Sequence, residues 1–253
     1  MLIAQISDTH ILAKESVLAA SASRAQNLRQ CIDDINRQRP DVVIHTGDSV
    51  QDGKPEEYAH LREILEALDA PYYPVQGNRD RQAALCDALD HLSFLPRAGN
   101  FLQYVVEDYP LRLVGLDSVV AGERKGVFSQ DRQAWLEQTL SEQPDRPTLL
   151  FMHHPPFDID PHYVGGYRRG QEAQSLTQLI KRHSQVVRLL CGHVHCPHRE
   201  EPWGGTVATT MPSVAVDLRK GVDPEYGDAP LYMLHRLSAD GSLDSQLCKA
   251  GSA

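Results

Sequence analysis

The chain has 253 residues, of which 41% are hydrophobic, and its formal net charge at pH 7 is −9. This length suits one large domain or two small ones, and the hydrophobic content is normal for a globular core. With only 25 Lys and Arg residues, the chain lacks the basic face of a protein whose main task is to grip duplex nucleic acid.

The five cysteines are odd in number and include no C-x-x-C pair. This profile is typical of a reduced, intracellular protein rather than of a disulfide framework. The N-terminal residues show no basic region followed by a long apolar stretch, and no later segment approaches the length of a membrane span. We therefore expect a cytoplasmic location and no membrane-spanning segment.

The first part of the chain predicts alternating strands and helices, which implies parallel strands joined by right-handed crossovers. These elements are a strand at 2–6, a helix at 23–37, a strand from 42, a helix at 55–68 and a strand at 72–75. Further strands are predicted at 101–106, 111–116, 148–152 and 186–191, and further helices at 81–89, after Ser129 and at 175–182. The remaining strands, predicted at 206–210, 231–237 and 243–248, are expected to form a second sheet that closes a sandwich.

Five of the predicted strands end in side chains that can bind metal ions. In chain order these are Asp8 and His10, Asp48, Asn78, His153, and His193 and His195. Any one of them alone more often marks a turn, but the strands of one sheet present their carboxyl ends to a common crevice. Seven oxygen and nitrogen ligands without a thiolate exceed what one ion normally takes from a protein, and they suit two ions that share a carboxylate.

The motifs D-x-H, G-D, G-N-x-D, H-H-P-P and G-H-x-H follow one another between Asp8 and His195. In this series the chain resembles the calcineurin-like metallophosphoesterase superfamily. The stretches 47–58, 151–156 and 191–195 are similar to the bacterial class III cyclic nucleotide and glycerophosphodiester phosphodiesterases, and the similarity fades after about residue 212. The resemblance implies an α/β fold, namely a four-layer αββα sandwich of two mixed sheets.

The same resemblance implies a single domain over residues 1–253. The C-terminal ~40 residues are expected to be an added sheet or a dimerisation element, which leaves a homo-oligomer open.

Carried over position by position, the resemblance also implies a set of metal ligands. One ion would be held by Asp8, His10, Asp48 and His195, and a second by Asp48, Asn78, His153 and His193. The ligand types suit Mn, Fe or Zn. The implied activity is hydrolysis of a small phosphodiester, either a cyclic nucleotide such as 3′,5′-cAMP or a glycerophosphodiester, by water that the two ions activate. Asp52 and Asp80 are candidates for orienting the ligands.

Arg79 departs from the family pattern, in which this position of G-N-x-D usually carries a histidine. Because Arg stays protonated, it can clamp a phosphoryl oxygen but cannot act as a general acid. Two other interpretations are an outward-facing Arg without a role and a marker for another substrate, since G-N-R-D also occurs in the related UDP-2,3-diacylglucosamine pyrophosphohydrolases. Those enzymes carry an apolar lid for acyl chains, and the sequence has no such insertion, so this activity is the alternative.

A second alternative is a metal-binding scaffold with weak catalysis. All seven ligand positions carry competent residues, which favours retained metal.

His154 is a further candidate, because it follows His153 and could contact the substrate or donate a proton to the leaving group. Four more candidates lie between two ligand motifs, where they could stack on a nucleotide and bind its phosphate, or else form a solvated turn. These are Tyr163, Tyr167, Arg168 and Arg169. Arg79 and His154 are thus the candidate catalytic residues beyond the metal ligands.

Overall fold

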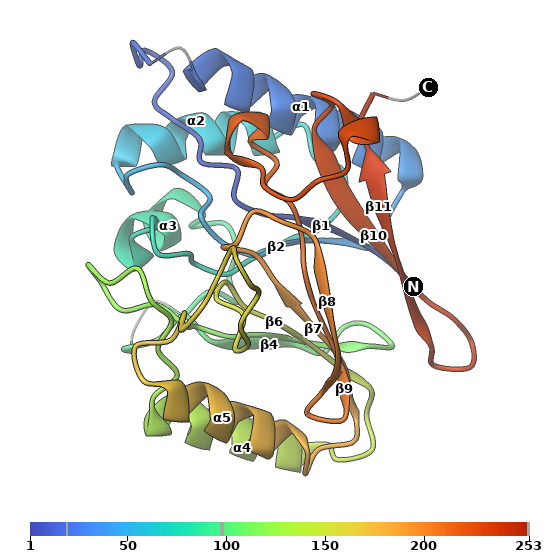
Figure 1. Cartoon of the computed structure of the whole chain (residues 1–253). Helices are drawn as coiled ribbons and strands as arrows, with labels where there is room; N and C mark the ends of the chain where they lie inside the picture. Colours follow the sequence, from blue (N-terminus) through green and yellow to red (C-terminus); the bar gives the residue numbers. More distant parts are fainter. Residues whose placement is uncertain (19, 97–98, 252–253) are drawn as a thin grey trace.

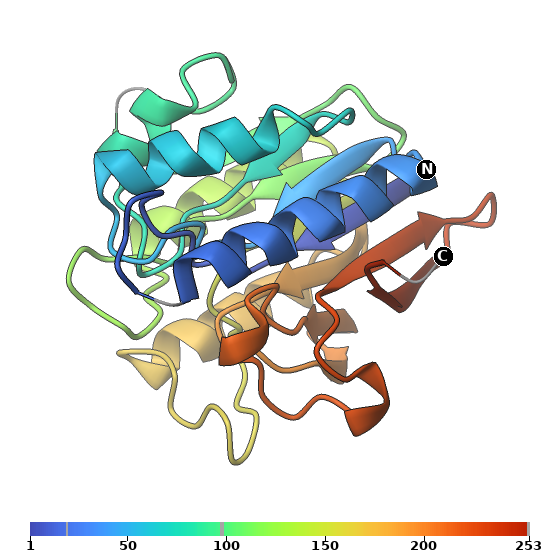
Figure 2. The same cartoon turned by 90° about the horizontal axis from the view of Figure 1, so that it is seen from above.

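In the computed structural model, which describes residues 1–18, 20–96 and 99–251, two mixed β-sheets lie face to face between two layers of helices (Figure 1). The first helical layer holds α1 (Ala20–Gln38), α2 (Pro55–Leu65) and α3 (Gln82–Ala88), and the second holds α4 (Gln130–Glu142) and α5 (Gly170–Ile180). Seen from above, α1 and α2 lie side by side over the first sheet (Figure 2). The predicted αββα sandwich is confirmed.

The first sheet has five strands in the order β11-β10-β1-β2-β3. Their bounds are β1 Leu2–Ile6, β2 Val42–His45, β3 Tyr72–Pro74, β10 Leu231–Leu237 and β11 Leu243–Lys249. β1, β2 and β3 run parallel, whereas β10 is antiparallel to β1 and to β11. Every residue of β2 is buried, because a parallel strand inside a sandwich is covered on both faces, which explains its unbroken apolar run.

The second sheet has six strands in the order β4-β5-β6-β7-β9-β8. Their bounds are β4 Tyr104–Val106, β5 Arg112–Gly115, β6 Thr148–Phe151, β7 Val186–Cys191, β8 His198–Trp203 and β9 Thr206–Thr210. β5, β6, β7 and β9 run parallel, and the edge strands β4 and β8 run antiparallel to their neighbours. The carboxyl ends of the parallel strands therefore point to one edge of this sheet.

The hydrophobic core is divided by the second sheet. Leu149 and Phe151 of β6 belong to the cluster between the two sheets, whereas Leu150 belongs to the cluster under α4 and α5. This alternation follows from the two-residue period of a strand. Leu28 and Ile35 of α1 belong to the same cluster as Leu149 and Phe151, which therefore extends to the helical layer over the first sheet, as expected from their spacing on one helix face.

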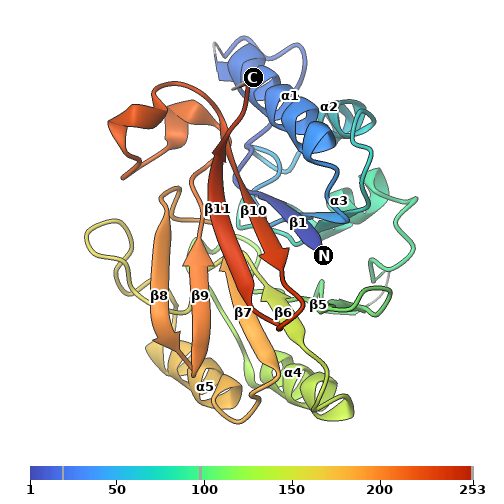
Figure 3. The same ribbon diagram turned by 90° about the vertical axis from the view of Figure 1, so that its right-hand side faces the viewer.

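One expectation about the C-terminal part was wrong, and one strand was missed. The predicted second sheet of late strands does not exist as such, because β9 joins the second sheet while β10 and β11 extend the first (Figure 3). β8 was not predicted at all. Its sequence His-Arg-Glu-Glu-Pro-Trp is polar and mostly exposed, since an edge strand needs little apolar surface.

Gln5 of β1 links the two sheets near their carboxyl ends. Its Nε2 donates to the Cys191 carbonyl at the end of β7 (3.2 Å) and to Thr46 Oγ1 after β2 (3.0 Å). The residues that follow β1, β2 and β7 are thereby held at one place. All five cysteines are free thiols, and within the described ranges no helix has the length and apolar character to cross a membrane.

Candidate metal centre

All seven predicted metal ligands lie together where the carboxyl ends of both sheets meet. Asp8 and His10 follow β1, Asp48 follows β2, Asn78 follows β3, His153 follows β6, and His193 and His195 follow β7. The loops after β1 and β2 are joined by main-chain hydrogen bonds from Asp8 N to the Gly47 carbonyl (2.9 Å) and from His10 N to the Asp48 carbonyl (3.0 Å). The strand ends therefore bring these side chains together.

The first cluster consists of Asp8, His10, Asp48 and His195, whose potential ligand atoms all lie within 4.8 Å of one another. His195 Nε2 lies 3.2 Å from Asp8 Oδ1 and 3.2 Å from His10 Nε2. His10 Nε2 lies 3.6 Å from Asp48 Oδ2. Two carboxylates and two imidazoles thus converge on one point.

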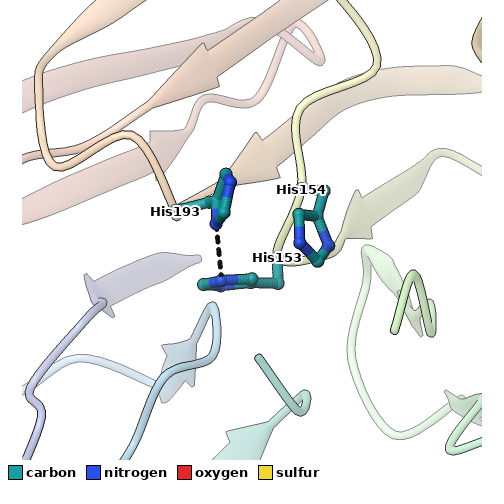
Figure 4. Close-up of side chains that lie close together, drawn as sticks. All are labelled: His153, His154 and His193. Atoms are coloured by element: carbon teal, nitrogen blue, oxygen red, sulfur yellow. Dashed lines mark hydrogen bonds between the residues drawn. The ribbon is translucent and has the colours of Figure 1, made fainter. Parts of the chain in front are cut away.

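The second cluster consists of Asp48, Asn78, His153 and His193. His153 Nε2 lies 3.1 Å from His193 Nδ1, 3.2 Å from Asn78 Oδ1 and 3.5 Å from Asp48 Oδ1. The two rings point toward each other in Figure 4. Because Asp48 directs Oδ2 to the first cluster and Oδ1 to the second, its carboxylate stands between them.

Hydrogen bonds to main-chain carbonyls fix the tautomers of two of these histidines. His153 Nδ1 donates to the Thr46 carbonyl (2.8 Å), and His195 Nδ1 donates to the Leu218 carbonyl (3.0 Å). In the neutral rings Nε2 is then an acceptor, and it faces other acceptors in the clusters. Acceptors that converge in this way need a cation between them, and a carbonyl on the far ring nitrogen is the usual support of a metal-binding histidine. The residues present therefore fit divalent metal ions.

His154 also lies within ligand distance of His153 and His193, but its two ring nitrogens are already used. Nε2 donates to the Arg124 carbonyl (3.2 Å), which makes Nδ1 the acceptor for the Ser118 hydroxyl (2.9 Å). Ser118 Oγ in turn accepts from the His154 main-chain N–H (3.2 Å). The fully buried His154 ring packs on His193 with 4.3 Å between centroids.

The backbone of the site is strained. Among the described residues, six non-glycine residues have a positive φ, a conformation that few non-glycine residues adopt and that Asn, Asp and His adopt more often than the others. Five of them are predicted ligands: Asp8 (51°), His10 (46°), Asp48 (50°), His193 (70°) and His195 (59°). Such strain concentrates at functional sites, where the surrounding structure maintains it.

Burial dominates the titration behaviour of the clusters. Burial raises the pKa of Asp48 to about 7, and nearby Asp8 and Asp80 add to the rise. Burial raises the pKa of Asp8, but the combined interactions with His195, His153 and His10 outweigh it and hold this pKa below its ordinary value. The interaction with Asp8 in turn raises the pKa of His195 despite burial. Burial lowers the pKa of His10 to about 3 and that of His193 well below its ordinary range. These rings are neutral at pH 7, as metal ligands must be.

Asp80 supports the loops that carry Asp48 and Asn78, as expected. Its buried carboxylate accepts from the N–H groups of Ser49 (3.1 Å) and Gly77 (2.8 Å) and from the Tyr58 hydroxyl (3.0 Å). The expectation for Asp52 was wrong, because its side chain pairs with Lys54 Nζ at the surface (3.0 Å).

The candidate substrate residues differ in whether their side chains already have partners within the protein. The Arg79 guanidinium, which is partly exposed, has no hydrogen-bond or ion-pair partner in the described part of the chain. Tyr163 packs edge-on against His193 (5.2 Å between centroids), and the buried Tyr167 hydroxyl donates to the His154 carbonyl (3.1 Å). The two arginines that follow pair with acidic residues: Arg168 with Glu123 (3.3 Å) and Arg169 with Glu172 (3.7 Å).

Several supporting groups were missed by the sequence reasoning. Ser118 could have been found, since it follows the strand predicted at 111–116, as the metal-binding candidates follow their strands. The carbonyls of Thr46 and Leu218 carry no side-chain signal and could not have been predicted.

The comparisons with known proteins agree with this geometry. Residues 1–197 match the model of the calcineurin-like phosphoesterase family. The chain belongs to this family. A probable glycerophosphodiester phosphodiesterase GpdQ of Arcobacter nitrofigilis is 34% identical over 258 positions, covering 99% of this chain and 94% of the relative. The 3′,5′-cyclic adenosine monophosphate phosphodiesterase CpdA of Escherichia coli K12 is 28% identical over 97% of this chain and 88% of its own length.

The solved structures extend the likeness to the fold of the calcineurin-like phosphoesterases. A dimetal phosphatase from Danio rerio superposes with a TM-score of 0.73 at 15% identity, over 99% of both chains. Such low identity supports the shared fold alone.

The first cluster depends on a glycine at the end of β7, and this gives a prediction. A Cβ at Gly192 would lie 2.0 Å from Ser7 Oγ and 2.7 Å from Asp8 Oδ2. We expect Gly192→Ala to push Asp8 out of place, to lower the unfolding free energy by about 1–3 kcal/mol and to reduce bound metal. Urea unfolding and metal analysis measure both effects. Gly170→Ala is the control, because its Cβ meets nothing within 4 Å; equal behaviour of the two variants would contradict the prediction.

Proposed function

We propose that the chain is a dinuclear-metal phosphodiesterase that hydrolyses small phosphodiesters. The observation that carries the proposal is the pair of clusters that share the Asp48 carboxylate, with Oδ2 3.6 Å from His10 and Oδ1 3.5 Å from His153. Two ions at such a site supply Lewis-acid charge that activates water and neutralises a phosphoryl group. The substrates we propose are cyclic nucleotides such as 3′,5′-cAMP, or glycerophosphodiesters, the classes that the names of the relatives state.

The proposed ligands are those of the two clusters, with Asp48 as the shared ligand. Asn78 rather than His154 completes the second cluster, because both ring nitrogens of His154 are engaged by protein groups. We propose Mn, Fe or Zn as the ions, since oxygen and imidazole ligands without thiolate suit these metals. We propose that His154 and Tyr167 support the ligands His153 and His193, because the His154 ring packs on His193 and the Tyr167 hydroxyl donates to the His154 carbonyl.

Arg79 is proposed as the phosphate clamp. Its main-chain N–H donates to Asp48 Oδ1 (2.7 Å), so the residue stands at the shared carboxylate, while its guanidinium lacks a described partner. A guanidinium binds two phosphoryl oxygens with its planar fork and leaves proton donation to another group. Tyr163, Arg168 and Arg169 stay proposals as substrate contacts on the neighbouring loop.

The remaining proposals concern location and assembly. We propose a cytoplasmic protein, supported by five free thiols, one domain over residues 1–253, and a homo-oligomer in which the C-terminal strands take part. The alternative activity, a pyrophosphohydrolase for a UDP-linked acylated sugar, is suggested by Arg79. Large exposed apolar side chains in the described ranges are only Val17, Leu18 and Val164, which is little surface for acyl chains.

A substrate panel tests the function. Metal-reconstituted protein is assayed on 3′,5′-cAMP, glycerophosphodiesters, bis-p-nitrophenyl phosphate and a UDP-linked pyrophosphate. We expect hydrolysis of the diesters and kcat/KM at least ~10-fold lower on the pyrophosphate, which corresponds to about 1.4 kcal/mol. Preference for the pyrophosphate would support the alternative, and metal binding without hydrolysis would support a scaffold.

Metal counting tests the shared ligand. We expect Asp48→Ala to lower the metal content at both sites, whereas Asn78→Ala lowers mainly one, because only Asp48 faces both clusters. Asp52→Ala is the control on the same loop, since its carboxylate pairs with Lys54 at the surface. Inductively coupled plasma analysis of the three variants gives the answer. Equal loss from Asp48→Ala and Asn78→Ala would remove the bridging role.

The role of Arg79 predicts a dependence on the leaving group. We expect Arg79→Ala to lower kcat/KM on diesters by roughly 10–100-fold, the value of one charge-assisted hydrogen bond. Arg37→Ala, which removes an exposed arginine from the last turn of α1, is the control and should leave kcat/KM within about twofold. We expect Arg79→His to raise the rate on alkyl esters relative to aryl esters, because imidazole can donate a proton. Equal rates of the parent enzyme on both ester classes, with chemistry rate-limiting, would refute this interpretation.

A further inference from the structure

Arg24 joins helix α1 to two segments that carry ligands of the first cluster. Its side chain is almost completely buried, and its guanidinium binds Asp217 through two bonds, from Nε to Oδ1 (3.1 Å) and from Nη2 to Oδ2 (2.7 Å). Its remaining nitrogen, Nη1, donates to the His10 carbonyl (3.3 Å) and to Gln51 Oε1 (2.8 Å). Every nitrogen of the fork is therefore used, which fixes the relative position of all its partners.

The Asp217 end of this contact controls His195. Asp217 belongs to a short 3₁₀ helix, Val216–Leu218, and the carbonyl of the next residue, Leu218, accepts the Nδ1–H of His195 (3.0 Å). Two residues further on, the Lys220 main-chain N–H donates to the His195 carbonyl (2.9 Å). This segment therefore sets both the ring orientation and the backbone of His195, and Arg24 anchors it to α1.

The other end of the contact controls His10. The backbone of His10 is in the left-handed region, with φ of 46°, and because the residue is buried its carbonyl needs a hydrogen-bond partner. Arg24 donates to that carbonyl, and Gln51, its other partner, donates its main-chain N–H to the Ile11 carbonyl (3.0 Å). The chain on both sides of the His10 carbonyl is thus tied to one guanidinium.

We propose that Arg24 is a positioning residue for the first metal ion. Through Asp217 and the His10 carbonyl it keeps the Nε2 atoms of His10 and His195 facing each other at 3.2 Å. In the described ranges Arg24 forms no hydrogen bond with a residue of the second cluster. Its only link to that cluster is Gln51, which lies on the loop that follows Asp48. The inference rests on the proposed metal ligands and adds a residue, remote in sequence, that sets the affinity of one ion and not of the other.

The test measures Mn²⁺ dissociation constants by calorimetry in two backgrounds that each weaken one site. In Asn78→Ala protein, which reports on the first site, we expect Arg24→Gln to weaken Mn²⁺ binding about 10–100-fold, as loss of a ligand-orienting partner does. In His10→Ala protein, which reports on the second site, we expect the same substitution to change binding by less than about twofold. Arg24→Lys should lie in between, because Lys keeps the charge and loses the fork.

Two further variants keep the result interpretable. Arg37→Gln removes an exposed arginine from the last turn of the same helix and should leave both constants unchanged. Asp217→Asn, whose side chain is 40% exposed, should weaken the first site selectively even if Arg24→Gln does not fold. Equal weakening of both sites, or loss of stability in urea without a change in either constant, would overturn the proposal. Since binding is measured without substrate, absence of hydrolysis in the panel would refute the function and leave this result standing.

Discussion

The structure depends on two carboxylates, Asp8 and Asp48, that are buried side by side where the two sheets meet. Removing charged groups from water costs several kcal/mol for each unless opposite charge compensates them. Burial drives the pKa of His10 down to about 3 and that of His193 well below its ordinary range, so these rings add no positive charge at pH 7. The pKa of His195 is raised by its interaction with Asp8, and this ring offsets part of the carboxylate charge. Bound cations would supply the rest of the compensating charge, which is why this set of ligands suits metal ions.

The backbone meets this demand at a cost. Each non-glycine residue in a sparsely populated conformation costs of order 1–3 kcal/mol, and five of the ligands adopt a positive φ. The strain is held by the mostly buried strands β1, β2 and β7, by the main-chain bonds between the loops of Asp8 and Asp48, and by Gln5, which ties β1 to the end of β7. A rigid sandwich is what allows so many strained ligands to coexist.

Much of this could be predicted from the sequence, because a buried strand and the polar residue that ends it are local signals. The strands that carry Asp8, Asp48, His153 and His193 are apolar runs, and parallel strands must present their ends at one edge. The groups that orient the ligands were beyond reach. A carbonyl such as that of Leu218 has no sequence signature, and Arg24 finds Asp217 across 193 residues. Edge strand β8 was also missed, because its residues are mostly exposed and therefore show no apolar pattern.

The turn after β3 shows how one scaffold can keep its metals and change its chemistry. Asn78 enters the second cluster with its side chain, whereas Arg79 reaches Asp48 with its main-chain N–H, at 2.7 Å. A main-chain bond does not depend on the identity of the side chain, so a histidine or an arginine at this position can hold the shared carboxylate equally well. In the proposed function the side chain faces the substrate, and its ability to lose a proton is the property that differs between the two residues. On that proposal the main chain of residue 79 supports the metal ligand Asp48 and its side chain affects the leaving group, so that the second property could change without loss of the first.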